Sequence, residues 1–108
     1  MDKVLSMIGM SARAGKVLSG EFAVEKGVKT YKAYLLILAA DASDNTKKKF
    51  KNMCEFYEVP LIEYATKDIL GGAIGKEMRS MVAITDEGLA DAVYSKWQSS
   101  HISDEGGK

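Results

Sequence analysis

Apolar residues recur along this chain in two rhythms, one typical of buried strands and one typical of helices. Unbroken apolar runs at 33–40 and 81–84 are each followed by polar turn or cap residues, a pattern that favours strands buried on both faces of a sheet. Shorter runs at 17–18 and 61–64 predict two further strands. The run at 33–40 is too short to cross a membrane as a helix, and we expect it to form the central strand.

Between these runs, apolar residues recur every three or four positions, which is the spacing of one helical face. This spacing predicts five helices, over residues 3–14, 19–31, 43–57, 66–74 and 86–97. Tyr31 is expected on the apolar face of the second helix, together with Val24 and Val28. Ile69 is expected on the apolar face of the fourth, next to Leu70.

Helices and strands therefore alternate along the chain. Alternation of this kind predicts the α/β class, as a three-layer α/β/α sandwich with a central mixed sheet of about four strands. The length of 108 residues suits a single domain, which we place at residues 1–98. Residues 99–108 are polar and are predicted to form a flexible C-terminal tail.

The composition favours a cytoplasmic protein without catalytic chemistry. The first residues lack the continuous apolar run of a signal peptide. Cys54 is the single cysteine, so it cannot close an internal disulfide; its place on an apolar helical stripe predicts a buried structural thiol. With His101 as the single histidine, Ser–His or Cys–His catalytic pairs and a zinc site are disfavoured. We expect no cofactor and no metal.

Two other motifs give only weak support for phosphate or metal chemistry. Gly15–Lys16 and Gly75–Lys76 lack the upstream glycine and the following Ser or Thr of a phosphate-binding loop. Asp41 follows the predicted central strand and remains a candidate ligand for Mg²⁺. A deep pocket beside Asp41 would favour an enzyme that acts on a small phosphorylated ligand.

Charge is distributed unevenly although the net charge is zero. Residues 1–51 contain ten basic and five acidic side chains, and residues 52–108 contain five basic and ten acidic ones. Such asymmetry indicates a side of the molecule that binds polyanions. Lysines that only solvate helix faces would give the same count, so charge alone leaves both interpretations open.

The predicted start of the second helix, at Ser19, Gly20 and Glu21, is the most promising binding feature. The first backbone N–H groups of a helix lack intrahelical partners and attract anions, and Lys16 and Lys26 lie close by in sequence. A carboxylate among these donors can accept hydrogen bonds from base edges. The alternative is that Glu21 only complements the helix dipole.

Four segments, at residues 14–21, 32–43, 59–60 and 70–76, read AGKVLSGE, KAYLLILAADAS, VP and LGGAIGK. In order and spacing they resemble the kink-turn RNA-binding ribosomal proteins of the L7Ae and L30e type. The Ser-Gly-Glu version resembles the small bacterial YlxQ-like branch of that family. The resemblance covers roughly residues 3–97.

This resemblance implies a non-catalytic RNA-binding domain whose partner is structured or ribosomal RNA, in a ribosome or ribonucleoprotein. In the family, the tip of the second helix reads the tandem sheared G·A pairs of a kink-turn. The loop before the last strand covers an unstacked nucleotide. By this resemblance Glu21 would accept hydrogen bonds from guanine edges, and Met78 and Arg79 would contact a base and a phosphate. The alternative for Met78 is that its side chain packs back onto the core.

The implied RNA-binding residues are Lys16, Ser19, Gly20, Glu21, Lys26, Met78 and Arg79. The chain departs from the pattern of archaeal members at three positions, with Leu18 for Gly, Gly20 for Asn and Val24 for a contacting Lys. These departures motivate an alternative, a protein-interaction module on the same fold that has lost RNA readout.

Overall fold

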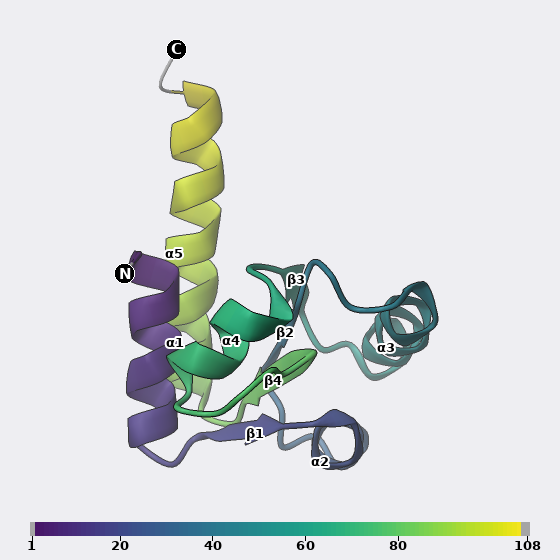
Figure 1. Cartoon of the computed structure of the whole chain (residues 1–108). Helices are drawn as coiled ribbons and strands as arrows, with labels where there is room; N and C mark the ends of the chain where they lie inside the picture. Colours follow the sequence, from purple (N-terminus) through teal and green to yellow (C-terminus); the bar gives the residue numbers. More distant parts are fainter. Residues whose placement is uncertain (1, 107–108) are drawn as a thin grey trace.

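The computed structural model describes residues 2–106, and the side chains of residues 2–100 among them. Five helices and four strands alternate over these residues (Figure 1), in the predicted order. The elements are α1 (Lys3–Arg13), β1 (Val17–Ser19), α2 (Glu21–Lys29), β2 (Leu35–Leu38), α3 (Asp44–Tyr57), β3 (Leu61–Glu63), α4 (Lys67–Ala73), β4 (Met81–Ile84) and α5 (Glu87–Gly106).

The four strands form one mixed sheet in the order β1-β4-β2-β3. β4 is antiparallel to both β1 and β2, whereas β2 and β3 are parallel. Every residue of β2 and of β4 is buried, which confirms that the two longest apolar runs are strands covered on both faces.

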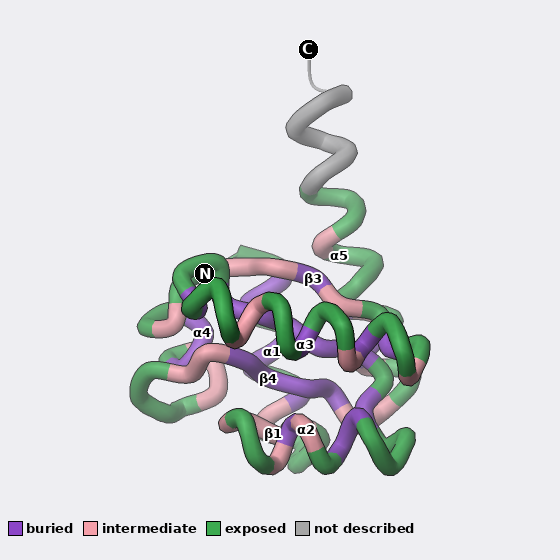
Figure 2. The backbone as a smooth tube through the Cα atoms, turned by 90° about the vertical axis from the view of Figure 1, so that its right-hand side faces the viewer, coloured by how far each residue is buried: buried purple, intermediate pink, exposed green. Residues whose placement is uncertain are grey.

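Alternate side chains of the sheet pack into two separate apolar clusters. Leu35 and Ile37 face the layer that contains α1, α4 and α5, while Leu36 and Leu38 face α2 and α3. This is the two-residue period of a strand. Figure 2 shows the buried positions gathered on the strands and the exposed positions on the outer turns of the helices. The three-layer α/β/α sandwich predicted from the sequence is therefore confirmed.

Two of the expected apolar positions are wrong. α2 ends at Lys29, so Tyr31 lies beyond the helix and not on its apolar face. Tyr31 has a φ of 60°, and its side chain is 65% exposed. Ile69 is 49% exposed, because Leu70 and Gly71 form the buried side of α4 and successive helical residues point about 100° apart.

α5 continues as a helix to Gly106, beyond the domain boundary expected at residue 98. Flexibility of residues 99–108 stays a prediction, and residues 107–108 of that segment lie outside the described residues. No helix in the described part of the chain has both the length and the apolar character needed to cross a membrane.

Candidate functional site

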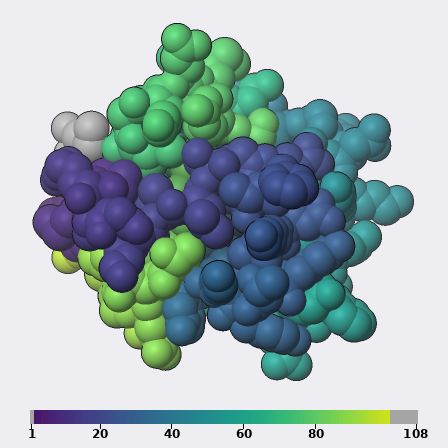
Figure 3. Space-filling model, turned by 90° about the horizontal axis from the view of Figure 1, so that it is seen from below, coloured from purple at the N-terminus to yellow at the C-terminus, as the bar shows by residue number. Residues whose placement is uncertain are grey.

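The pairing of β1 with β4 brings two distant segments together at one end of the sheet. These strands are antiparallel, with Ser19 opposite Val82, so the chain leaving β1 meets the chain entering β4. α2 begins directly after β1, and the segment 74–80 directly precedes β4. In Figure 3, seen from below, the green atoms of the segment near residue 80 border the blue-violet atoms of the β1–α2 region.

A hollow of about 470 Å³ lies where these segments meet. We call it the tip hollow. It is lined by residues 19–21 at the start of α2, by Thr46 in the first turn of α3, and by residues 78–81 before and within β4. Met78 stands at this hollow with 56% of its surface exposed.

The start of α2 presents its backbone to the tip hollow. Gly20 is the N-cap residue, and because glycine has no polar side chain, no side-chain capping bond reaches the first N–H groups of the helix. Its φ of 89° and ψ of 150° lie in a region that only glycine adopts readily. Glycine at this position thus both sets the entry angle of α2 and leaves its amide donors accessible.

Glu21 forms an ion pair across the helix interface with Lys49 of α3. The Lys49 Nζ lies 3.3 Å from the Glu21 Oε2 and 3.1 Å from the Glu25 Oε1. Hydrogen bonds from Lys29 and then Lys49 lower the pKa of Glu25, and hydrogen bonds to Glu25 and then Glu21 raise the pKa of Lys49. The Glu21 and Lys49 side chains are about half exposed, and exposed pairs of this kind contribute little free energy. Glu21 can therefore exchange Lys49 for another donor.

Arg79 connects the loop before β4 to the end of β1. Its Nε donates to the Ser19 Oγ at 3.3 Å, and its Nη1 donates to the Met78 carbonyl at 2.9 Å. A guanidinium carries five N–H donors, so these two bonds position the group and leave donors for an anion. Ser19, predicted as a direct binding residue, thus also holds Arg79 in place.

The same loop rests on Gly71 of α4. The Lys76 N–H donates to the Gly71 carbonyl at 2.9 Å. A Cβ at position 71 would come within 1.5 Å of the Glu77 carbonyl oxygen, so only glycine permits this approach. α4 thereby determines where Met78 and Arg79 lie.

Five of the seven predicted binding residues meet at the tip hollow, and two lysines do not. Ser19, Gly20, Glu21, Met78 and Arg79 line it. Lys16 is exposed just before β1, where its carbonyl accepts the Thr85 N–H at 2.8 Å. Lys26 lies by a second hollow, formed by α2 and Leu18.

Sequence reasoning missed the contribution of α3. Thr46 lines the tip hollow and Lys49 pairs with Glu21, yet both belong to a polar, lysine-rich stretch that is typical of a solvated helix face. Only the packing of α2 against α3 brings them to the site, and no local motif indicates this.

Asp41 has a structural role that the sequence did not indicate. Its Oδ1 accepts the N–H of Lys67, the first residue of α4, at 2.8 Å, which satisfies one of the unpaired donors of a helix start. Within the described residues, no three His, Cys, Asp or Glu side chains are grouped so that they could hold a metal ion.

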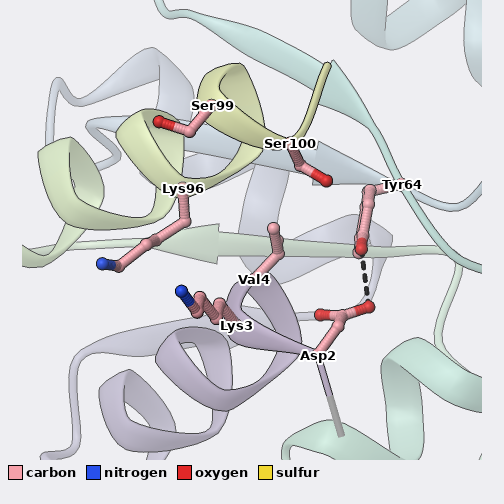
Figure 4. A pocket seen from close by; sticks show the side chains of 7 residues that line it. All are labelled: Asp2, Lys3, Val4, Tyr64, Lys96, Ser99 and Ser100. Atoms are coloured by element: carbon pink, nitrogen blue, oxygen red, sulfur yellow. Dashed lines mark hydrogen bonds between the residues drawn. The ribbon is translucent and has the colours of Figure 1, made fainter. Parts of the chain in front are cut away.

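A further hollow of about 470 Å³ lies between the start of α1 and residues 96–100 of α5, in the opposite layer (Figure 4). The Tyr64 hydroxyl donates to the Asp2 Oδ2 there at 2.6 Å. The Asp2 Oδ1 accepts the Leu5 N–H at 2.7 Å and caps α1. The Asp2 carboxylate at this hollow is thus engaged in helix capping, and none of the predicted binding residues lines the hollow.

The fold and the tip hollow define a small α/β protein whose candidate binding surface is built from a helix start and a loop. Residues 2–94 match the family described as "Ribosomal protein L7Ae/L30e/S12e/Gadd45 family". The chain belongs to this family, which confirms the resemblance read from the four segments.

Three known proteins illustrate this similarity. The chain is 43% identical to the RNA-binding protein YlxQ of Bacillus subtilis, over 82% of this chain and 89% of that protein. It is 28% identical to the large ribosomal subunit protein eL8 of Thermoplasma acidophilum, over 86% and 78% of the two chains. The Giardia lamblia 15.5kD RNA binding protein superposes with a TM-score of 0.74 at 26% identity, covering 85% and 79%.

Proposed function

We propose that this chain is a non-catalytic RNA-binding protein that recognises a kink-turn in structured or ribosomal RNA. The observation that carries the proposal is the tip hollow, where the amide donors of α2, the Glu21 carboxylate and the Arg79 guanidinium come together. The family match and the printed names of YlxQ, eL8 and the 15.5kD protein support the same conclusion. A ribosome or other ribonucleoprotein is then the assembly in which it acts, in the cytoplasm.

Each group of the tip hollow has a distinct role in this proposal. The N–H groups at the start of α2 and Arg79 bind phosphate oxygens, because both are donors suited to anions. Glu21 accepts hydrogen bonds from guanine N–H groups. Phosphate oxygens are acceptors and need donors, so a carboxylate acceptor at this place serves to recognise a base. Met78 packs on an unstacked base. Lys16 and Lys26 lie outside the hollow and neutralise phosphates of the flanking backbone.

Val24 does not contribute to this surface. It is fully buried between α2 and the sheet, so the position where archaeal members carry a contacting lysine offers no contact here. The proposal therefore relies on Arg79 and the lysines around α2 for positive charge. If the wild-type protein bound no kink-turn RNA in a salt-dependent way, the protein-interaction module would become the better interpretation.

The proposal is tested by substituting Glu21→Ala and measuring affinity for two RNAs by gel shift. One RNA contains a kink-turn, and in the other Watson–Crick pairs replace the G·A pairs. A base-reading contact is worth about 1–3 kcal/mol by analogy with duplex readout, so Glu21→Ala should weaken kink-turn binding by about 5- to 150-fold. Binding to the paired control should change little.

Glu55→Ala is the matched control, because Glu55 is an exposed glutamate of α3 that does not line the tip hollow. It removes the same charge and should leave both affinities unchanged. An equal loss on both RNAs after Glu21→Ala would refute the readout role of Glu21. Equal binding of both RNAs by the wild-type protein would refute kink-turn recognition itself.

A further inference from the structure

A second hollow, of about 260 Å³, is lined by residues of α2 and by Leu18 and Lys32, which flank that helix in the sequence. We call it the flank hollow. Its floor is Leu18, which sits so close to α2 that a Cβ on Gly27 would come within 2.6 Å of the Leu18 Cδ1. Phe22 forms one wall, and Lys26 and Lys32 lie around it.

Phe22 contributes almost nothing to the core of the protein. Its side chain is 85% exposed, the highest value among the large exposed apolar residues of the described chain. A single exposed apolar residue is common on protein surfaces. Phe22 differs because it directly follows Glu21 and because its ring borders an apolar hollow with lysines around it.

The charge around the flank hollow favours an anionic ligand. Its lining includes Lys26 and Lys32 and no carboxylate side chain. The two acidic residues of α2, Glu21 and Glu25, are held on the side of Lys49 instead. Lys26 follows Phe22 by four positions, so the ring and the ammonium group share one face of the helix.

We infer that the flank hollow binds one unpaired nucleotide of the strand that adjoins the kink, with its base stacked on Phe22. Lys26 and Lys32 neutralise the phosphates on either side of that nucleotide. An aromatic ring beside cationic side chains is the combination that holds single-stranded nucleic acid without reading its sequence. This inference rests on the proposed function, because the kink bound at Glu21 supplies the strand.

Consecutive residues at the start of α2 line the two hollows, Glu21 the tip hollow and Phe22 the flank hollow. Phe22 follows Glu21 by a rise of about 1.5 Å and a turn of about 100°. A strand held at the helix tip therefore reaches the Phe22 ring by passing around the first turn of α2. Lys26 lies outside the tip hollow but lines the flank hollow. In this inference its partner is a phosphate next to the nucleotide stacked on Phe22.

The test compares two kink-turn RNAs, one trimmed to blunt ends at the kink and one with a few unpaired nucleotides added next to it. Base stacking on an aromatic ring is worth about 1–3 kcal/mol. Phe22→Leu keeps an apolar side chain but removes the π face. It should weaken binding of the extended RNA by about 5- to 150-fold and leave the trimmed RNA unaffected, whereas Phe22→Tyr should match the wild type on both.

The lysines give an independent measurement on the extended RNA. Lys26→Gln and Lys32→Gln should each lower the slope of log K against log salt by about 0.7, the value for single strands. Lys29→Gln is the matched control, because the Lys29 Nζ is paired with the Glu25 Oε2 at 2.8 Å and Lys29 does not line the flank hollow.

The outcomes separate this inference from the proposed function. If Phe22→Leu leaves the extended RNA unaffected while Glu21→Ala still weakens binding, the stacking site is wrong and kink-turn recognition stands. An equal loss on trimmed and extended RNA would also overturn the assignment to the adjoining strand. If the wild-type protein does not distinguish the kink-turn from its paired control, both proposals fail.

Discussion

Glu21 has a lysine on one side and the tip hollow on the other. Lys49 is 3.3 Å from its carboxylate but is closer to Glu25, at 3.1 Å. When an RNA donor replaces Lys49 at Glu21, Lys49 keeps its second partner, so the exchange leaves no charge isolated. Because all three groups are at least partly exposed, water also compensates the change. The ion pair therefore orients Glu21 without occupying it permanently.

Cys54 provides a residue-scale prediction about pH. It is only 2% exposed, and burial raises the pKa of its thiol to about 11 from an ordinary value near 9. The unfolded chain ionises first as the pH rises, so Cys54 should stabilise the fold fully below pH 9 and progressively less up to pH 11. In that window the free energy of unfolding should fall by up to about 1.4 kcal/mol per pH unit through this group.

The measurement is urea unfolding of the wild type and Cys54→Ala at several pH values. The Ala variant carries the same tyrosines and lysines, so the difference between the two proteins isolates the thiol. That difference should be constant below pH 9 and should shrink between pH 9 and 11. A difference that stays constant through pH 11 would show that the thiol titrates normally in the folded protein.

At the scale of elements, the short helix α4 controls the loop that carries Met78 and Arg79. Gly71 lies against the Glu77 carbonyl, whereas an added Cβ at its neighbour Gly72 would meet no atom within 4 Å. The two glycines have the same local sequence context in one helix. Tertiary contact with the loop is what makes them differ.

Gly71→Ala should therefore destabilise the fold, by about 1–3 kcal/mol as for other overpacked sites, and should displace the loop. Gly72→Ala should instead stabilise α4 by about 0.4–1 kcal/mol, because it restricts the unfolded chain without a clash. Thermal unfolding of both variants gives the sign of each effect. Kink-turn affinity should drop for Gly71→Ala alone, and equal behaviour of the two variants would contradict the close approach at Gly71.

At the scale of the whole molecule, part of the positive charge in the first half of the sequence is neutralised by tertiary contacts. Lys47 and Lys51 both pair with Glu63 of β3, at 3.4 and 2.6 Å, although Glu63 belongs to the acidic half. Lys16 and Lys26 take part in none of the ion pairs in the described part of the chain. The proposed polyanion-binding surface therefore relies on fewer lysines than the sequence count indicates, with Lys16 and Lys26 among those that take part in none of these ion pairs.

Lys16→Gln should accordingly lower the salt dependence of kink-turn binding, by about 0.7–0.9 in the slope of log K against log salt. Lys96→Gln is the control, since Lys96 lies on α5 in the opposite layer, by the hollow at Asp2. Its slope should equal that of the wild type. Titrations at four or five salt concentrations measure both, and identical slopes for the two variants would place the RNA elsewhere.

Local sequence determined the elements and the layer architecture of this protein. The unbroken apolar runs indicated β2 and β4 because a strand covered on both faces needs apolar residues at every position. The recurrence of apolar residues every three or four positions over residues 43–57 indicated α3, whose buried residues include Cys54. Errors arose at Tyr31 and Ile69, where helix length and orientation depend on the rest of the fold.

Tertiary structure alone decided which residues share a surface. The residue types at 19–21 and the family pattern pointed to the helix tip, but its neighbours Thr46, Lys49 and residues 78–81 come from other elements. Their arrangement depends on strand order and on the packing of α2 against α3, which no local periodicity encodes. Side-chain pattern determines whether a segment becomes a helix or a strand, whereas the contacts between segments far apart in the chain determine what each one faces.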